Sequence, residues 1–228
     1  MSSLAKLLTY VRTGQFGAIR DAINERIPWW LYHRSNAAIY VLYRSERMST
    51  NIAGPLPQEF SCRLATRDEM PACSRITGLD VSEYYRRFDA GDICYGVFVG
   101  GRPVNINWVH SGPYFVRGMG YLGIASQSDR YVYGIMTDPA ERGKGLYKSC
   151  LERLAEYLFA NGAEQLVQLV EEGNTPVLKT LPQLGYVKTE EISYRSFMGI
   201  KRTRVTDCRS GRVTVRRFMF SPKDRFVI

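Results

Sequence analysis

The chain has 228 residues, of which 45% are apolar, and this is ordinary for one well-packed globular domain with an extension. It contains no signal-peptide core and no apolar run of about 20 residues, so we expect no membrane-spanning helix. The five cysteines form no CxxC pair and only two histidines are present, so we expect reduced thiols, a cytoplasmic location and no metal site.

Residues 1–58 differ in pattern from the rest of the chain. Leucine, valine and isoleucine recur at helical spacing over residues 4–27, basic residues lie between them, and Trp29 and Trp30 follow. We predict an amphipathic helical extension that ends in a linker at 48–58. Such helices either pack on the main domain or on another subunit of a homodimer, or lie on an anionic membrane surface. The sequence leaves these alternatives open.

Residues 59–200 read as one domain in which strands and helices follow one another. Strand patterns alternate apolar and polar residues, and Ser, Thr or Asp residues mark helix starts. The predicted elements, in chain order, are a strand over 60–64, a helix after Thr66, a helix after Asp80, strands over 93–99 and 104–109, a strand over 131–136, a helix from Leu146, a strand over 164–170, a helix after Asn174 and a strand over 186–196. The long connection over 111–128 suits a lid or an acceptor-binding loop.

The stretch over 131–160 carries the chain's most informative motif. An apolar strand ends at a Pro-containing turn, the basic loop RGKG follows at 142–145, and a helix begins at Leu146. The first amides of a helix lack internal partners and attract anions, while glycines let a phosphate approach the backbone closely. We therefore predict an anion-binding loop. It matches neither the nucleotide P-loop nor the GxGxxG dinucleotide turn.

This arrangement resembles the acyl-CoA site of the GCN5-related N-acetyltransferases, the GNAT superfamily. Arg142, Gly145 and Tyr147 fall on the positions of the family's Gln/Arg-x-x-Gly-x-Gly/Ala motif, and Tyr147 stands where a small residue is usual. The segment NTPVLKTLPQLGY at 174–186 resembles the family's later Asn-x-x-Ala…Leu-Gly-Phe segment. The resemblance covers about residues 60–198 and implies an α/β (α+β) GNAT fold, with a mixed, mostly antiparallel central sheet flanked by helices.

The resemblance also implies acetyl-CoA, or another acyl-CoA, as co-substrate. In the family the pantetheine arm pairs with a splayed strand edge as a pseudo-strand, and the loop amides hold the pyrophosphate. The cofactor-binding residues that follow from it are Ile135, Met136, Thr137, Arg142, Gly143, Lys144, Gly145, Leu146, Tyr147 and Asn174.

Acyl transfer to an amine needs a polarised thioester carbonyl, a base for the amine and an acid for the thiolate. Many family members place a glutamate on the motif strand and a tyrosine acid on the last helix, where this chain has Tyr133 and Leu181. The candidate catalytic residues are Tyr133, His110 and Tyr147. Each also suits a packing role in the core or at a strand end.

Residues 201–228 hold nine Lys and Arg against two acidic residues, and most of the net charge of +9 comes from them. Alternation around Ser210-Gly211 predicts a basic β-hairpin. It is either an edge strand that arginines protect from aggregation or a surface for an anionic headgroup, phosphate or polyanion. The aromatic residues do not interleave with the arginines, so we do not expect a nucleic-acid partner.

We therefore predict an acyl-CoA-dependent N-acyltransferase that moves acetyl to a primary amine. An amino sugar of cell-envelope polysaccharide synthesis is one acceptor class that fits, at the inner face of the membrane. The alternative is a catalytically inactive GNAT-fold binding or regulatory protein docked at a membrane surface.

Overall fold

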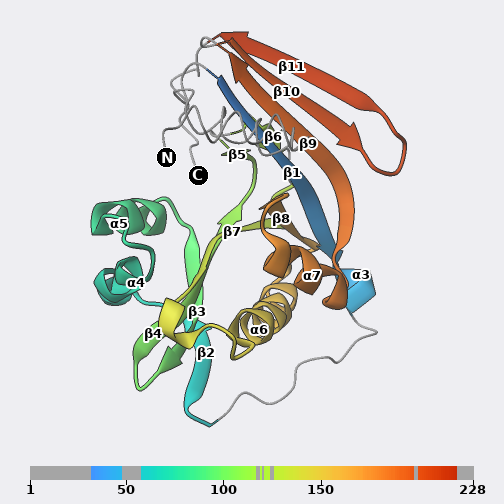
Figure 1. The fold of residues 1–228 in the computed structure, drawn as a ribbon. Helices are drawn as coiled ribbons and strands as arrows, with labels where there is room; N and C mark the ends of the chain where they lie inside the picture. Colours follow the sequence, from blue (N-terminus) through green and yellow to red (C-terminus); the bar gives the residue numbers. More distant parts are fainter. Residues whose placement is uncertain are drawn as a thin grey trace, which may run out of the picture.

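The computed structural model describes residues 32–47, 58–116, 119, 121–123, 126–197 and 200–219. These residues form a nine-stranded sheet in the order β11-β10-β9-β1-β8-β7-β4-β3-β2, and β5 and β6 form a separate pair. Within this described part β7 and β8 run parallel, and the other neighbours in the sheet are antiparallel. The predicted mixed, mostly antiparallel sheet flanked by helices is confirmed (Figure 1).

The strands are β1 (Tyr32–Tyr43), β2 (Phe60–Leu64), β3 (Ile93–Val99), β4 (Arg102–Ser111), β5 (Tyr114–Val116), β6 (Tyr121–Gly123), β7 (Asp129–Thr137), β8 (Gln165–Glu171), β9 (Val187–Phe197), β10 (Ile200–Asp207) and β11 (Val213–Met219). The helices are α3 (Arg44–Arg47), α4 (Met70–Thr77), α5 (Val81–Asp89), α6 (Leu146–Ala160) and α7 (Thr175–Gln183), with short 3-10 helices η1 (Arg67–Glu69) and η3 (Pro139–Glu141). Each element predicted for 60–196 is present, with ends shifted by a few residues.

The sheet opens between its two parallel strands. β7 and β8 pair over residues 129–131 and 165–167, and beyond Tyr131 and Val167 no further pair joins them. Figure 1 shows the result, in which β2, β3, β4 and β7 form one arm and β8, β1, β9, β10 and β11 form the other. The later residues of β7 therefore present a backbone edge toward the gap between the arms.

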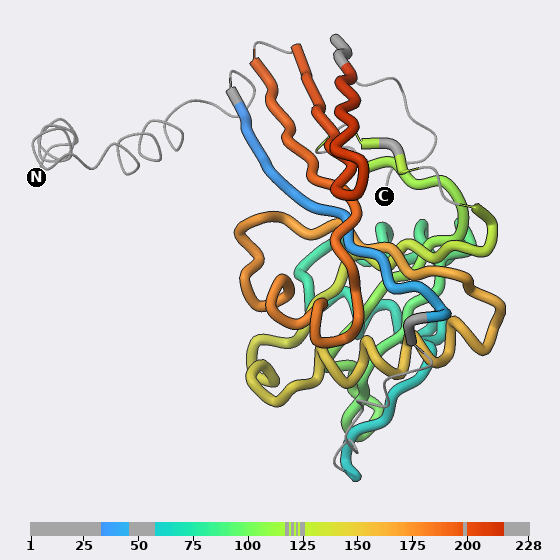
Figure 2. Tube along the Cα trace, turned by 90° about the vertical axis from the view of Figure 1, so that its right-hand side faces the viewer, coloured from blue at the N-terminus to red at the C-terminus, as the bar shows by residue number. Residues whose placement is uncertain are grey.

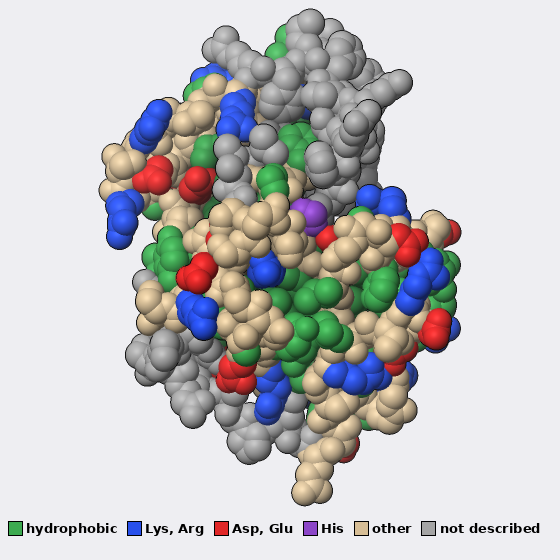
Figure 3. Space-filling view, turned by 180° about the vertical axis from the view of Figure 1, so that it is seen from behind, with side chains coloured by type: hydrophobic (Ala, Val, Ile, Leu, Met, Phe, Trp, Pro, Cys, Tyr) green, Lys and Arg blue, Asp and Glu red, His purple; other side chains and the backbone are tan. Residues whose placement is uncertain are grey.

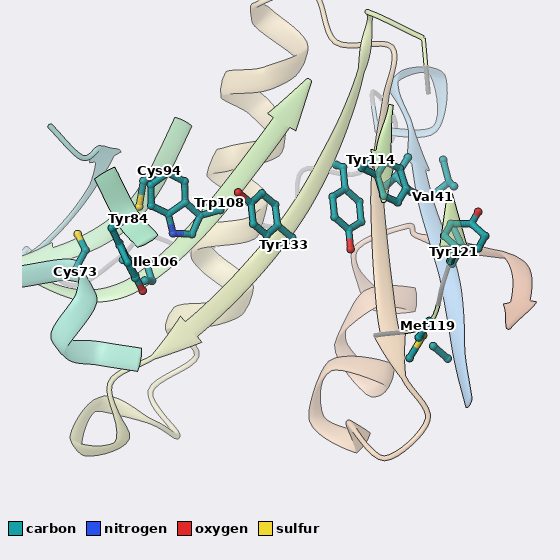
Figure 4. Packing of buried hydrophobic residues seen from close by; sticks show 14 of the residues in the cluster. Val41, Cys73, Tyr84, Cys94, Ile106, Trp108, Tyr114, Met119, Tyr121 and Tyr133 are labelled. Carbon is teal, nitrogen blue, oxygen red and sulfur yellow. The ribbon is translucent and has the colours of Figure 1, made fainter. Parts of the chain in front are cut away.

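Helices cover both faces of the first arm. Along β4, Trp108 faces α4 and α5, where its ring meets Tyr84 edge-on at 5.4 Å, while Val109 faces α6 on the other side. Tyr84, Trp108 and Tyr133 lie side by side although α5, β4 and β7 supply them (Figure 4). Full burial of such side chains contributes about 1.5–3 kcal/mol each, so these contacts fix α5 against the sheet.

Residues 32–43 correct the sequence-based interpretation. They form β1, which pairs antiparallel with β8 on one side and β9 on the other, so the predicted helical extension over 1–58 is wrong for this segment. Figure 2 shows β1 in blue running beside the C-terminal strands. Its β-branched and aromatic residues suit a central strand, and Ala37, Ile39 and Val41 are buried on one face. The rest of that extension and linker, 1–31 and 48–57, lies outside the described residues.

The C-terminal strands β10 and β11 pair antiparallel around a turn at residues 208–212, where the sequence predicted a hairpin. Asp207 closes the turn by accepting from the Ser210 amide at 2.6 Å, and Gly211 has φ of 68°. β10 also pairs with β9. The hairpin therefore extends the main sheet instead of forming a separate tail, and residues 220–228 of the predicted tail lie outside the described part.

The long connection over 111–128 contains β5 and β6. Tyr114 stacks on Tyr131 of β7 with centroids 3.8 Å apart and planes 4° apart. Tyr121 donates a hydrogen bond of 2.6 Å to Glu190 of β9. The connection is thus attached to both arms of the sheet. Its role as a lid or acceptor loop stays a prediction.

Candidate active site

The loop between β7 and α6 has the conformation that an anion-binding turn requires. Gly143 and Gly145 have φ of 81° and 72°, in the region that favours glycine, and a Cβ at either position would meet nothing within 4 Å. Gly145 is the N-cap of α6, and its carbonyl accepts from the Ser149 amide at 3.1 Å. The space in front of the helix start is therefore open to a ligand.

The amides at this helix start point into that space without partners. Among the described residues, no carbonyl or side chain accepts a hydrogen bond from the amides of Gly143, Lys144, Gly145, Leu146 or Tyr147. Such amides and the helix dipole together favour a bound anion. The local backbone therefore fits the pyrophosphate of an acyl-CoA.

Ion pairs connect the loop to β4 and link residues within it. Arg102 of β4 donates to Asp138 and Glu141 at 2.8 Å each, and Lys144 donates to Glu141 at 2.7 Å. The hydrogen bond to Glu141 raises the pKa of Lys144. Arg142 has no acidic partner in the described part of the chain and donates to the Thr137 carbonyl at 3.3 Å. Arg142 is thus the loop cation that remains available to a phosphate.

The end of β7 before the loop is hydrogen-bonded on the side of β4 and unpaired on the side of β8. Asn105 of β4 donates to the Met136 carbonyl at 3.2 Å and to the Thr137 hydroxyl at 2.8 Å. Asn105 is fully buried. The opposite edge of Ile135, Met136 and Thr137 lies beyond the last β7–β8 pair, so these three predicted residues lie where an added strand could bond.

Two predicted cofactor residues lie in other surroundings. Asn174 is exposed at the start of α7, and its carbonyl accepts from the Leu178 amide at 3.0 Å. Leu146 is buried in the core between α6 and the sheet. Leu146 therefore anchors the loop, while Asn174 has an accessible side chain near the end of β8.

The catalytic candidates divide between the two faces of the sheet. Tyr147 of α6 is partly buried and packs against the core that α6 and α7 cover, where burial raises the pKa of its phenol. Tyr133 and His110 lie on the α4/α5 face, on the paired strands β7 and β4. The structure thus brings Tyr133 and His110 together and leaves Tyr147 apart from them.

Asp92, which the sequence interpretation missed, joins these two residues. It precedes β3 and is only 6% exposed. His110 Nδ1 lies 2.7 Å from Asp92 Oδ1, and the Tyr133 hydroxyl donates to Asp92 Oδ2. His110 Nε2 lies 3.2 Å from the Pro113 carbonyl. Because both ring nitrogens face acceptors, this geometry suits the imidazolium form.

Burial and charge set the protonation of the cluster. The hydrogen bond to Asp92 raises the pKa of His110 above its usual 6.5. Burial, with the Asp92 charge, raises the pKa of Tyr133, so its phenol stays protonated. Tyr133 therefore carries its proton at neutral pH, whereas His110 can accept one once it has become neutral.

A bulge places this cluster at the point where the strands diverge. The β4–β7 register shifts so that Gly134 and Ile135 stand opposite Asn107. Gly134 has φ of 56°, and a Cβ there would lie 2.9 Å from Arg87 and 3.1 Å from Trp108. Since β7 leaves β8 just before, at Tyr131, the acid–base cluster lies next to the opening of the sheet.

Within the described ranges, no group of three or more His, Cys, Asp or Glu residues could hold a metal ion. No helix of the described part is long and apolar enough to cross a membrane. The face turned away from the viewer in Figure 1 carries a central patch of hydrophobic side chains among charged ones (Figure 3).

Comparison with known proteins gives both a family and a fold. The model of the acetyltransferase (GNAT) family matches residues 69–186, just over half of the chain. No curated protein matches it.

Solved structures share its architecture at low identity. An acetyltransferase of the GNAT family from Colwellia psychrerythraea is 13% identical with a TM-score of 0.52, and the match covers 73% of this chain and 57% of that one. A GCN5-related N-acetyltransferase-like protein from Streptococcus suis is 15% identical with a TM-score of 0.51, and the match covers 78% of this chain and 67% of that one. A GNAT-family protein from Novosphingobium aromaticivorans is 12% identical with a TM-score of 0.50, and the match covers 71% of this chain and 63% of that one. These likenesses show the fold, and the family match shows that the chain belongs to the GNAT family of acetyltransferases.

Proposed function

We propose that the protein transfers the acetyl group of acetyl-CoA to a primary amine. The observation that carries the proposal is the continuous path from the open edge of β7 to the unpartnered amides at the start of α6. A strand edge that ends at an anion-binding helix start suits a ligand with an amide-rich arm and a pyrophosphate.

Each part of the cofactor has a candidate set of residues. The amides from Gly143 to Tyr147, with Arg142, would hold the pyrophosphate, and the backbone of residues 135–137 would pair with the pantetheine arm. Acetyl-CoA supplies the activated thioester. On this arrangement the thioester end lies toward the divergence point at Tyr131, and therefore toward the acid–base cluster.

We propose His110 as the base for the amine and Asp92 as the residue that orients it. Asp92 fixes Nδ1 as the protonated nitrogen, so Nε2 is the nitrogen that accepts a proton when the ring is neutral. Because the Pro113 carbonyl lies 3.2 Å from Nε2, the incoming ammonium has to take the place of that carbonyl. The neutral amine then attacks the thioester carbonyl and the C–S bond breaks. The proton that the nitrogen loses as the amide forms balances the one that the CoA thiolate takes up. Tyr133, whose phenol is protonated at neutral pH, is the candidate to relay that proton to the thiolate.

An amine-dependence assay tests the function. Release of free CoA thiol from acetyl-CoA would be followed with a panel of primary amines, including amino sugars, one acceptor class that fits the sequence. Thiol release that requires both an amine and acetyl-CoA supports the proposal. Binding of acetyl-CoA without amine-dependent release from any member of the panel favours the non-catalytic alternative instead.

Asp92→Asn sharpens that test. We expect a loss of about a hundredfold in kcat/KM with acetyl-CoA affinity unchanged, because the variant disturbs proton transfer and not the phosphate loop. Asp89→Asn is the matched control, since it makes the same change three residues away, where Asp89 pairs with Arg67 at 3.1 Å on the surface. Equal effects of the two substitutions would refute the role of Asp92.

A further inference from the structure

A second cavity lies on the other arm of the sheet. Its volume is about 670 Å³, and β1, β9 and β10, together with the start of α7, supply most of its lining. None of its described lining residues belongs to β7, η3 or α6. The volume falls in the range of small-molecule sites. This cavity is therefore separate from the loop and strand edge described above.

Arginines from three adjacent strands stand in one row of this cavity. Arg34 of β1 is the register partner of Arg195 of β9, and Arg195 is the register partner of Arg202 of β10. All three line the cavity, so they project from the same face. Neighbouring strands lie about 4.8 Å apart. Arg204, two residues along β10, adds a fourth guanidinium on that face.

No acidic side chain of the described residues pairs with these four arginines. The two acids of the cavity have other partners within it, because Glu172 accepts from Asn36 at 2.8 Å and Glu191 accepts from Lys188. Like charges directly opposite one another destabilise a sheet. The row is thus a concentration of positive charge without a direct ion pair among the described residues, and the five basic side chains of the cavity outnumber its two acidic ones, Glu172 and Glu191.

We propose that this arginine row binds a ligand that carries two or more closely spaced phosphate groups. A planar guanidinium binds a phosphate through paired hydrogen bonds, and three guanidinium groups at strand spacing match adjacent phosphates better than one isolated phosphate. Asn36, Ser193 and Thr206 continue the cavity floor in the next rows. They offer uncharged polar contacts to the rest of the ligand.

Calorimetric titration of the full chain with inorganic pyrophosphate tests the site. We expect Arg202→Gln, and separately Arg195→Gln, to weaken binding about tenfold or more, since a charge-assisted contact is lost. Arg216→Gln is the matched control. It removes the same charge from the neighbouring strand, but Arg216 pairs with the buried Thr203 on the opposite face of the hairpin.

Pyrophosphate could also occupy the loop at α6, so each titration is repeated in the Gly145→Glu chain, in which that loop is blocked. Binding that survives Gly145→Glu and is weakened by Arg202→Gln and Arg195→Gln supports the arginine row, even if acetyl-CoA were never bound. Binding abolished by Gly145→Glu, or weakened equally by Arg216→Gln, overturns the proposal.

Two probes distinguish the sources of such a ligand. Uridine diphosphate represents a soluble diphosphate, and phosphatidylcholine vesicles that carry polyprenyl diphosphate represent a lipid headgroup. Binding to either probe that depends on Arg195 and Arg202 supports the site and identifies its source. Failure of pyrophosphate and of both probes to bind would refute it.

Discussion

Replacing Gly145 by alanine separates the backbone's role in ligand binding from its role in folding. The Cβ would meet no atom of the protein within 4 Å, so the substitution adds no clash, but φ of 72° is unfavourable for alanine. That strain costs about 1 kcal/mol of folding stability. If the loop relaxes or the methyl group keeps the pyrophosphate away, one charge-assisted amide contact of about 1.5–3 kcal/mol is lost. We therefore expect the Kd for acetyl-CoA to rise about 10- to 100-fold.

Gly162→Ala is the control at the opposite end of the same helix. Gly162 has φ of 84° and equally open surroundings, so the folding cost should be similar, about 1 kcal/mol, while acetyl-CoA binding should not change. Denaturant unfolding measures the first quantity and isothermal calorimetry the second. If Gly145→Ala destabilises the fold as expected but binds acetyl-CoA like the wild type, the pyrophosphate site does not lie at this helix start.

Three further outcomes follow from the acid–base groups. The raised pKa of His110 means that its pair with Asp92 contributes stability below pH 6.5, which is lost as pH rises through the raised value; Asp92→Asn should remove that dependence in pH-dependent unfolding. By the same shift, kcat/KM should rise with pH until His110 is neutral, and a rate that falls over this range would contradict its role as base. Arg63 and the Thr66 amide lower the pKa of Glu69 to about 2, so Glu69→Gln should cost about 1–2 kcal/mol at neutral pH, and the difference should shrink as pH falls from 4.5 toward 2 in acid-unfolding curves.

Local patterns in the sequence were sufficient to predict the helices and strands of the central part of the domain. The capping box of Thr66 and Glu69 is formed, with the Thr66 amide donating to Glu69 at 2.8 Å. The paired glycines at 100–101 have positive φ and turn β3 into β4. Such elements depend on neighbours a few residues away, which is the range over which sequence patterns are informative.

The strand β1 could not be recognised in the same way because its partners are distant. Residues 32–43 become a strand by entering the sheet between β8 and β9, more than a hundred residues later in the chain. Mixed polar and apolar residues such as Arg34 and Asn36 weaken its local signal. The same insertion creates the arginine row, because it brings Arg34 beside Arg195.

The acid–base cluster shows why motif matching stops short of chemistry. Tyr133 and His110 were separate candidates because nothing in their spacing joins them, and Asp92 stood in a turn with no pattern of its own. In the β4–β7 register His110 lies opposite Tyr131, and Tyr133 follows two residues later on the same face of β7. Asp92, in the turn before β3, lies within hydrogen-bond distance of both His110 and Tyr133. A buried carboxylate would be costly to keep without partners, so the two hydrogen bonds that satisfy it also fix the orientation of its neighbours. The chemistry of this site therefore depends on strand register, which cannot be predicted from a single sequence.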